Sequence, residues 1–82
     1  MSVEEIFQTM RELVAEQFAM EPAEVSMETA FEEDLGADSV DLVELSMNLE
    51  EEFDIEEMSE EDIASIHTVG DLVGYLRSKL GE

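Results

Sequence analysis

The spacing of the apolar residues restricts the fold of this chain more than any other feature. In four segments these residues recur at intervals of three and four, which gives a helix one apolar face. No segment alternates apolar and polar residues in the way that indicates a strand. The spacing predicts helices over residues 2–17, 39–53, 59–66 and 68–80. We therefore expect an all-α fold, a small four-helix bundle with three longer helices, one short third helix and a long first loop.

Residues suited to helix caps stand at the start of each predicted helix. A Ser, Thr or Asp followed three residues later by an acidic residue can form a capping box, which satisfies amides at the helix start. Gly36 lies in the turn before the second helix and can adopt a positive φ without steric cost. At that helix both Asp38 and Ser39 are suitable caps, and the sequence leaves the choice open. The capping pairs are Ser2 with Glu5, Asp38 with Asp41, Ser59 with Asp62, and Thr68 with Asp71.

The first loop, residues 19–35, is long for a chain of this size. Pro22 can begin a short turn there. Apolar residues spaced too irregularly for a helix are expected to anchor the loop to the core. In the last predicted helix, Gly70 and Gly74 lower helix propensity but allow a neighbouring segment to approach closely. The expected anchors of the loop are Val25, Met27, Phe31 and Leu35.

The chain is strongly acidic, because 24 Asp and Glu residues against three Lys and Arg residues give a net charge of −21. This charge argues against binding to nucleic acids or anionic membranes and favours basic protein partners. A disordered acidic chain would have a similar charge, but 44% of these residues are apolar and their spacing is helical. The sequence suits one domain, 1–82, without cysteine and without the ~20 apolar residues of a membrane span. We expect a monomer in the cytoplasm.

The predicted second helix has apolar residues on two sides. One set has the spacing of a core face, and the other, which we call the apolar strip, consists of Val40, Val43 and Met47. The strip could be a second buried face. It could also be an exposed docking face, because acidic residues surround it. The core set contains Leu42, Leu45, Ser46, Leu49 and Phe53, and the surrounding acids are Asp41, Glu44, Glu50 and Glu51.

Ser39 is expected at the N-terminus of the second helix, where free amides and the helix dipole favour a phosphate group. From its position alone, an ordinary helix cap is the favoured explanation of this serine. His67 is the only histidine and there is no cysteine, so we expect no zinc site and no catalytic base near Ser39. Acidic pairs such as Asp38 with Asp41 would bind divalent cations only loosely, and no specific metal site is expected.

The residues around Ser39 resemble those of acyl carrier proteins. The segment Asp-Leu-Gly-Ala-Asp-Ser-Val-Asp ends at Asp41 and is followed by Val-Glu-Leu at 43–45 and Glu-Glu-Glu-Phe at 50–53. In that family the serine of a Gly-x-Asp-Ser-Leu motif is attached to 4′-phosphopantetheine, and the matching residue here is Ser39. The similarity covers nearly the whole chain and is nearest to the type II proteins of fatty-acid synthesis. It departs from the family at Val40, which is most often Leu, and at 56–59, where relatives have an Ile-Pro or Ile-Ser turn.

This resemblance implies a carrier rather than an enzyme. A phosphopantetheinyl transferase would attach the arm from coenzyme A to Ser39, and the arm's thiol would hold acyl groups as thioesters for separate, basic-patched synthases, reductases and acyltransferases. The implied docking face contains Asp38, Val40, Asp41, Val43, Glu44, Met47, Glu50 and Glu51. The interior that would part to shelter an acyl chain contains Leu45, Leu49, Phe53, Ile63, Ile66 and Leu72. The alternatives are an acidic helical interaction module without a prosthetic group, and a carrier of a polyketide or other specialised pathway.

Overall fold

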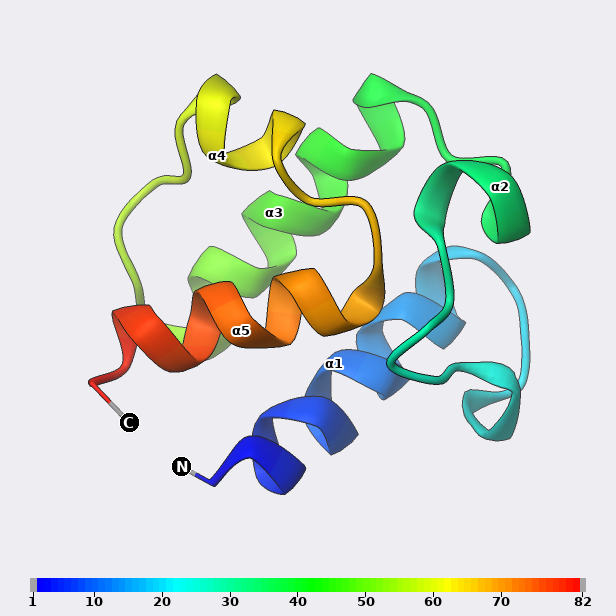
Figure 1. The fold of residues 1–82 in the computed structure, drawn as a ribbon, viewed down its shortest axis with the longest axis horizontal. Coiled ribbons are helices and arrows are strands. Elements are labelled where there is room, and N and C mark those ends of the chain that lie inside the picture. The colour runs from blue at the N-terminus through cyan, green and yellow to red at the C-terminus, as the bar shows by residue number, and fades with distance from the viewer. Residues whose placement is uncertain (1, 82) are drawn as a thin grey trace.

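The structure, a computed structural model, describes residues 2–81, and every regular element in that range is a helix apart from one isolated bridge. The predicted all-α fold is therefore confirmed. Figure 1 shows three longer helices, α1, α3 and α5, with the short helices α2 and α4 toward the top of the view. No helix within residues 2–81 is both long and apolar enough to cross a membrane. In order, the elements are α1 (Val3–Gln17), the 3-10 helix η1 (Pro22–Glu24), α2 (Phe31–Leu35), α3 (Ser39–Phe53), α4 (Glu60–Ala64) and α5 (Val69–Lys79).

The capping boxes predicted from the sequence are all present. In each one, the side chain of the first residue accepts a hydrogen bond from the amide three residues later, and the acidic side chain there accepts one from the first residue's amide. These bonds satisfy amides that have no partner within the helix. As a result, α1, α3, α4 and α5 begin within one residue of their predicted starts.

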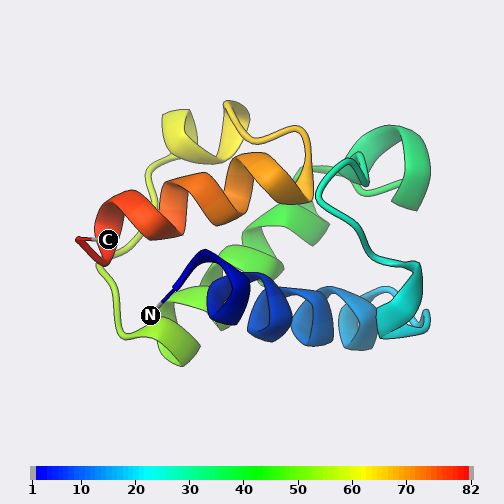
Figure 2. The ribbon, with the colours of Figure 1, turned by 60° about the horizontal axis from the view of Figure 1, so that its bottom comes forward.

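The core lies between α1, α3 and α5. α1 runs beside α5 in both Figure 1 and Figure 2, and the start of α1 and the end of α5 lie on the same side of the molecule. The apolar faces predicted for these helices point inward, so the burial of their side chains stabilises the bundle. The fully buried side chains include Ile6, Met10 and Val14 of α1, Leu45 and Leu49 of α3, and Val69, Val73 and Leu76 of α5.

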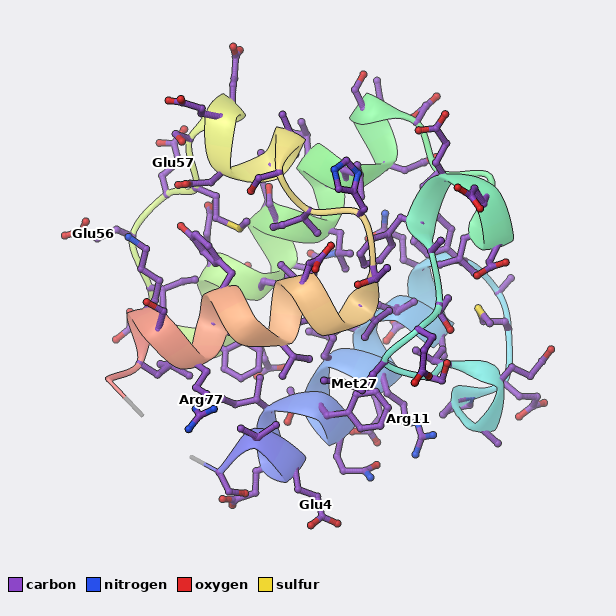
Figure 3. The ribbon with its side chains drawn as sticks, in the orientation of Figure 1. Glu4, Arg11, Met27, Glu56, Glu57 and Arg77 are labelled. Carbon is purple, nitrogen blue, oxygen red and sulfur yellow. The ribbon has the colours of Figure 1, made fainter. Side chains whose placement is uncertain are left out.

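The first loop contains more regular structure than the sequence predicts, because η1 and α2 both lie within it. Val25 and Phe31 are buried, as predicted for anchors, and Leu35 packs against the core. The prediction for Met27 is wrong, since this residue is 36% exposed and is not among the side chains packed against the core (it is labelled in Figure 3). The backbone carbonyl of this residue contacts the start of α5.

The segment 27–31 is hydrogen-bonded to the start of α5. A Cβ on Gly70 would lie 2.9 Å from the Met27 carbonyl oxygen, so the close approach predicted at this glycine is confirmed. The same prediction for Gly74 is wrong, because nothing lies within 4 Å of the Cβ position there. The bonds run from the Phe31 amide to the His67 carbonyl at 2.9 Å, from the Val69 amide to the Thr29 carbonyl at 3.0 Å, and from the Gly70 amide to the Met27 carbonyl at 2.8 Å.

The short helix α4 is held against α5 by a side-chain hydrogen bond. The Tyr75 hydroxyl of α5 donates to the Asp62 carboxylate of α4 at 3.1 Å. Burial, together with this carboxylate, raises the pKa of the Tyr75 phenol. Ile66 is buried just after α4 and Ile63 is half-buried, as predicted, but no residue within α4 itself is fully buried. Among the helices, α4 therefore has little core packing of its own to resist local opening.

Candidate functional site

The turn before α3 is fixed by the way α2 ends. Gly36 adopts the left-handed backbone conformation (φ 64°, ψ 27°) that is common at helix C-termini. The next residue, Ala37, is buried, and its amide donates a hydrogen bond to the Phe31 carbonyl at 2.9 Å. A side chain at Gly36 would be strained at this φ, so the glycine permits the tight turn that leads into α3.

The N-cap of α3 is Asp38 and not Ser39. The Asp38 carboxylate accepts a hydrogen bond from the Asp41 amide at 3.0 Å, and the Asp41 carboxylate accepts one from the Asp38 amide at 3.1 Å. Ser39 is therefore the first residue within the helix, and its side chain is exposed. Its hydroxyl lies outside the capping box, beside the positive end of the helix dipole.

A cleft of about 750 Å³ lies beside Ser39. It is bounded by α2, the first half of α3 and the segment from α4 to α5. Its walls are mixed, with apolar side chains on the inner side and acidic side chains at the rim. The residues that line it include Phe31, Ala37, Leu42, Val43, Ile63 and Ile66, together with Glu32, Glu33, Asp38, Glu60 and His67.

A much smaller cavity of about 10 Å³ lies deeper in the molecule, between α3, α4 and α5. It offers about the space of one water molecule, so an acyl chain cannot enter unless the walls move. Leu42, Ile63 and Ile66 line both the cleft and this cavity, so these three side chains separate the two spaces. Of the residues predicted to shelter an acyl chain, those that line the cavity are Leu45, Leu49, Ile63, Ile66 and Leu72.

The lining of the cavity differs from the predicted pocket at a few positions. Phe53 is buried, but it is the last residue of α3 and does not line the cavity. Leu42 and Ser46 line it and were assigned by the sequence only to the core face of their helix. Helical spacing places both residues on the same side of the helix as Leu45, so the periodicity alone could have assigned them to the acyl pocket. Met58 also lines the cavity, but it follows α3 in an irregular segment where no periodicity exists to detect it.

The apolar strip on α3 is exposed and is not a second core face. Val40 is 65% exposed, Val43 is 44% exposed and Met47 is 60% exposed. Of the acids predicted to surround the strip, Glu44 and Glu51 are also exposed. An apolar strip that no part of residues 2–81 covers, with carboxylates beside it, has the composition of a protein-docking surface.

Two other acids predicted for the docking face also have structural roles. The Glu50 carboxylate accepts a hydrogen bond from the Met58 amide at 2.9 Å and so braces the segment after α3. The Asp41 carbonyl accepts a hydrogen bond from Gln17 Nε2 at 2.7 Å, which joins α3 to the end of α1. Both acids are half-buried, so their side chains are less available to a partner than Glu44 is.

His67 is exposed and lies at the edge of the cleft rather than in a catalytic arrangement. Its amide donates a hydrogen bond to the Asp71 carboxylate at 3.0 Å, and the Thr68 amide donates another at 3.1 Å. These two bonds hold the pKa of Asp71 below its usual value of 3.8. Within residues 2–81, no three His, Cys, Asp or Glu side chains are grouped closely enough to hold a metal ion.

Comparison with known proteins connects this geometry to a family. The family described as phosphopantetheine attachment site matches residues 8–76. An acyl carrier protein from Clostridium acetobutylicum is 44% identical over 77 residues, which cover 94% of this chain and 99% of the relative. The chain belongs to the acyl carrier protein family. The solved structure of the acyl carrier protein from Enterococcus faecalis matches with a TM-score of 0.79 and 35% identity, over 96% of this chain and 99% of that one.

Membership of the family confirms the main functional predictions. This acyl carrier protein is a carrier and not an enzyme, and its prosthetic group is a covalently attached 4′-phosphopantetheine. The phosphate of that group fits the start of α3, where amides without helical partners and an exposed serine lie together. Acyl carrier proteins interact with phosphopantetheinyl transferase and with enzymes of fatty-acid synthesis. These comparisons favour a carrier with a prosthetic group over an interaction module without one.

Proposed function

We propose that Ser39 is the residue to which the 4′-phosphopantetheine arm is attached. The observation that supports this most strongly is that Asp38 provides the cap of α3, so the exposed Ser39 hydroxyl can react without loss of a capping bond. A phosphodiester at Ser39 would be close to the amides of the first helical turn, which favour an anion. The adjacent cleft offers apolar and polar walls to the rest of the arm.

The docking face for partner enzymes is the apolar strip together with the carboxylates beside it. Glu44 and Glu51 are the exposed acids along the strip. Asp38 and Asp41 lie at the N-terminal end of α3, on either side of the arm in the sequence. The net charge of −21 would attract the basic patches of a transferase, synthase, reductase or acyltransferase from a distance. The strip would then supply the apolar contact once the two proteins meet.

The interior of the bundle is the proposed shelter for the acyl chain. A chain on the arm would leave the cleft beside Ser39, pass Leu42, Ile63 and Ile66, and enter the cavity beyond them. The cavity of about 10 Å³ must enlarge for this to happen. Movement of α4 is the simplest way, because its contacts with the core are few and it contributes one wall of the cavity.

The acyl chain belongs to fatty-acid synthesis in this proposal, because the Leu-Gly-Ala-Asp-Ser segment is closest to the fatty-acid type of carrier.

To test the attachment site and the pathway in turn, the unmodified protein is incubated with coenzyme A and a broad-specificity phosphopantetheinyl transferase, and the loaded arm is then offered to fatty-acid synthesis enzymes. Ser39→Ala should remain unmodified. Ser59→Ala, which alters another exposed serine at a helix start, should be modified normally. Modification of Ser39→Ala would refute the proposed site.

A further inference from the structure

One polar side chain lines the small cavity in the interior. Ser46 is 4% exposed and lies on the inward face of α3. A buried hydroxyl among aliphatic side chains costs free energy unless it is hydrogen-bonded. The other residues that line the cavity are all apolar: Leu42, Leu45, Leu49, Met58, Ile63, Ile66 and Leu72.

The hydrogen bonding of Ser46 leaves it able to accept but not free to donate. Its hydroxyl donates its proton to the Val43 carbonyl at 2.7 Å, within the same helix. A hydroxyl has one proton to donate and two lone pairs that accept. The proton of Ser46 is therefore engaged, whereas its oxygen keeps the capacity to accept a hydrogen bond from a group that enters the cavity.

Ser46 also lies on the path that the acyl chain would follow. Leu42 lines both the cleft beside Ser39 and the cavity, and Ser46 is four residues further along α3, on the same face. Four residues correspond to about one helical turn, or ~5.4 Å along the helix axis. An acyl chain that passes Leu42 would therefore meet the Ser46 oxygen about one turn deeper.

We propose that Ser46 is a specificity-determining residue that allows the interior to shelter an acyl chain bearing a hydroxyl group, such as a 3-hydroxyacyl thioester. This inference rests on the function proposed above. A hydroxyl brought into an aliphatic cavity loses its hydrogen bonds to water, and the Ser46 oxygen supplies a replacement acceptor. An oxo group brings only an acceptor, so it gains less from Ser46, whose proton is held by the Val43 carbonyl.

The experiment compares two acyl chains of equal length on matched proteins. Wild type and Ser46→Ala are loaded by the transferase from decanoyl-coenzyme A or 3-hydroxydecanoyl-coenzyme A, and the melting temperature of each product is measured. In wild type the two chains should raise the melting temperature by similar amounts. In Ser46→Ala the rise given by the 3-hydroxy chain should fall about 4–8 °C below that of the plain chain, the effect of one lost hydrogen bond.

Two further variants separate the cavity effect from the loss of a serine. Ser65→Ala removes the same kind of bond, from a serine hydroxyl to the carbonyl three residues earlier, here Asp62 at 2.8 Å. Ser65 is exposed and does not line the cavity, so in Ser65→Ala the two acyl chains should still raise the melting temperature by similar amounts. Ser46→Thr keeps a hydroxyl, so the difference in melting temperature between its two loaded forms should be smaller than in Ser46→Ala.

The outcomes distinguish this inference from the proposed function. If wild type is not loaded, or if Ser39→Ala is loaded, the proposed attachment site fails. If loading is normal but the difference in melting temperature between the two acyl forms is the same in wild type and Ser46→Ala, the assignment to Ser46 is overturned. The assignment is also overturned if neither chain raises the melting temperature of wild type, because the interior then shelters no chain.

Discussion

The amide of Gly70 donates a hydrogen bond to the Met27 carbonyl oxygen at 2.8 Å, and a Cβ on residue 70 would lie 2.9 Å from the same oxygen. The glycine is therefore required by close approach of two backbones rather than by an unusual φ. Through this contact the segment before α2 is held against the start of α5. Since α2 leads through Gly36 into α3, the contact helps to fix the turn that presents Ser39.

Substitution of the two glycines of α5 should have opposite effects on stability. Gly70→Ala should lower the free energy of unfolding by about 1–3 kcal/mol, because a backbone carbonyl must shift to admit the new methyl group. Gly74→Ala should raise it by up to about 1 kcal/mol, because the site is open and Ala is the better helix former. Urea unfolding of both variants measures the difference. Equal gains in stability would show that the Met27 contact is not restrictive.

The hydrogen bonds to Asp71 predict a contribution to acid sensitivity. The amides of His67 and Thr68 hold the folded-state pKa of Asp71 below 3.8, so its stabilising effect is complete above the pKa of the unfolded chain. This effect is lost as the pH falls through the lower, folded-state pKa. Asp71→Asn should therefore be less stable than wild type near neutral pH, with the difference shrinking below about pH 3.8.

The control for that experiment is Glu57→Gln, which also removes one negative charge but at an exposed position in the segment after α3 (Figure 3). Melting temperatures of wild type and both variants are compared from about pH 7 down to about pH 2.5. Removal of one charge from so acidic a chain relieves repulsion in both variants. A loss of stability at neutral pH that is equal in the two variants would contradict the role of the Asp71 hydrogen bonds.

Charge reversal on the docking face should weaken partner binding more than reversal elsewhere. Glu44→Lys places a cation beside the apolar strip, whereas Glu4→Lys makes the same change in net charge on the exposed side of α1 (Figure 3). For a basic phosphopantetheinyl transferase, we expect Glu44→Lys to weaken binding by about two- to tenfold and Glu4→Lys to have a smaller effect. Association rates measured at low and high salt provide the test. Similar losses for both variants would indicate attraction by total charge only.

The length of the acyl chain should determine how much loading stabilises the protein. Each methylene removed from water contributes about 0.8 kcal/mol, so longer chains sheltered behind Leu42 should raise the melting temperature more than shorter ones. Loading a series of saturated chains and recording thermal unfolding gives the trend. Met27→Ala serves as a control, because Met27 is exposed, lies outside the docking face and lines neither the cleft nor the cavity, so the trend should stay unchanged. A flat trend with chain length would argue against internal shelter.

The sequence predicts the parts of this structure that depend on neighbouring residues. The capping pairs are three residues apart, and the apolar faces follow a fixed period, so both are encoded locally. The bonds between segment 27–31 and the start of α5 join residues about 40 positions apart, and no local pattern predicts them. For the same reason the sequence could not show that Met27 is exposed or that Gly74, unlike Gly70, faces open space.

The candidate site shows the same division. Asp38 and Ser39 are equally good caps by residue type, and only the backbone geometry shows that Asp38 fills this role. The helix α2 was not predicted because its N-cap, Ala30, has no capping side chain, and its amide is bound instead by the Asp34 carboxylate at 2.7 Å. Gly36, read from the sequence as a turn, is also the residue that ends α2.

The attachment of the arm to Ser39 is tested most directly by the intact mass of the protein before and after incubation with coenzyme A and a broad-specificity phosphopantetheinyl transferase. Wild type should gain the mass of one phosphopantetheinyl group, and fragmentation should locate it on Ser39. Ser39→Ala should gain nothing while melting close to wild type, because Asp38 still caps α3. A gain that persists in Ser39→Ala, or its absence from folded, unmodified wild type, would contradict the account.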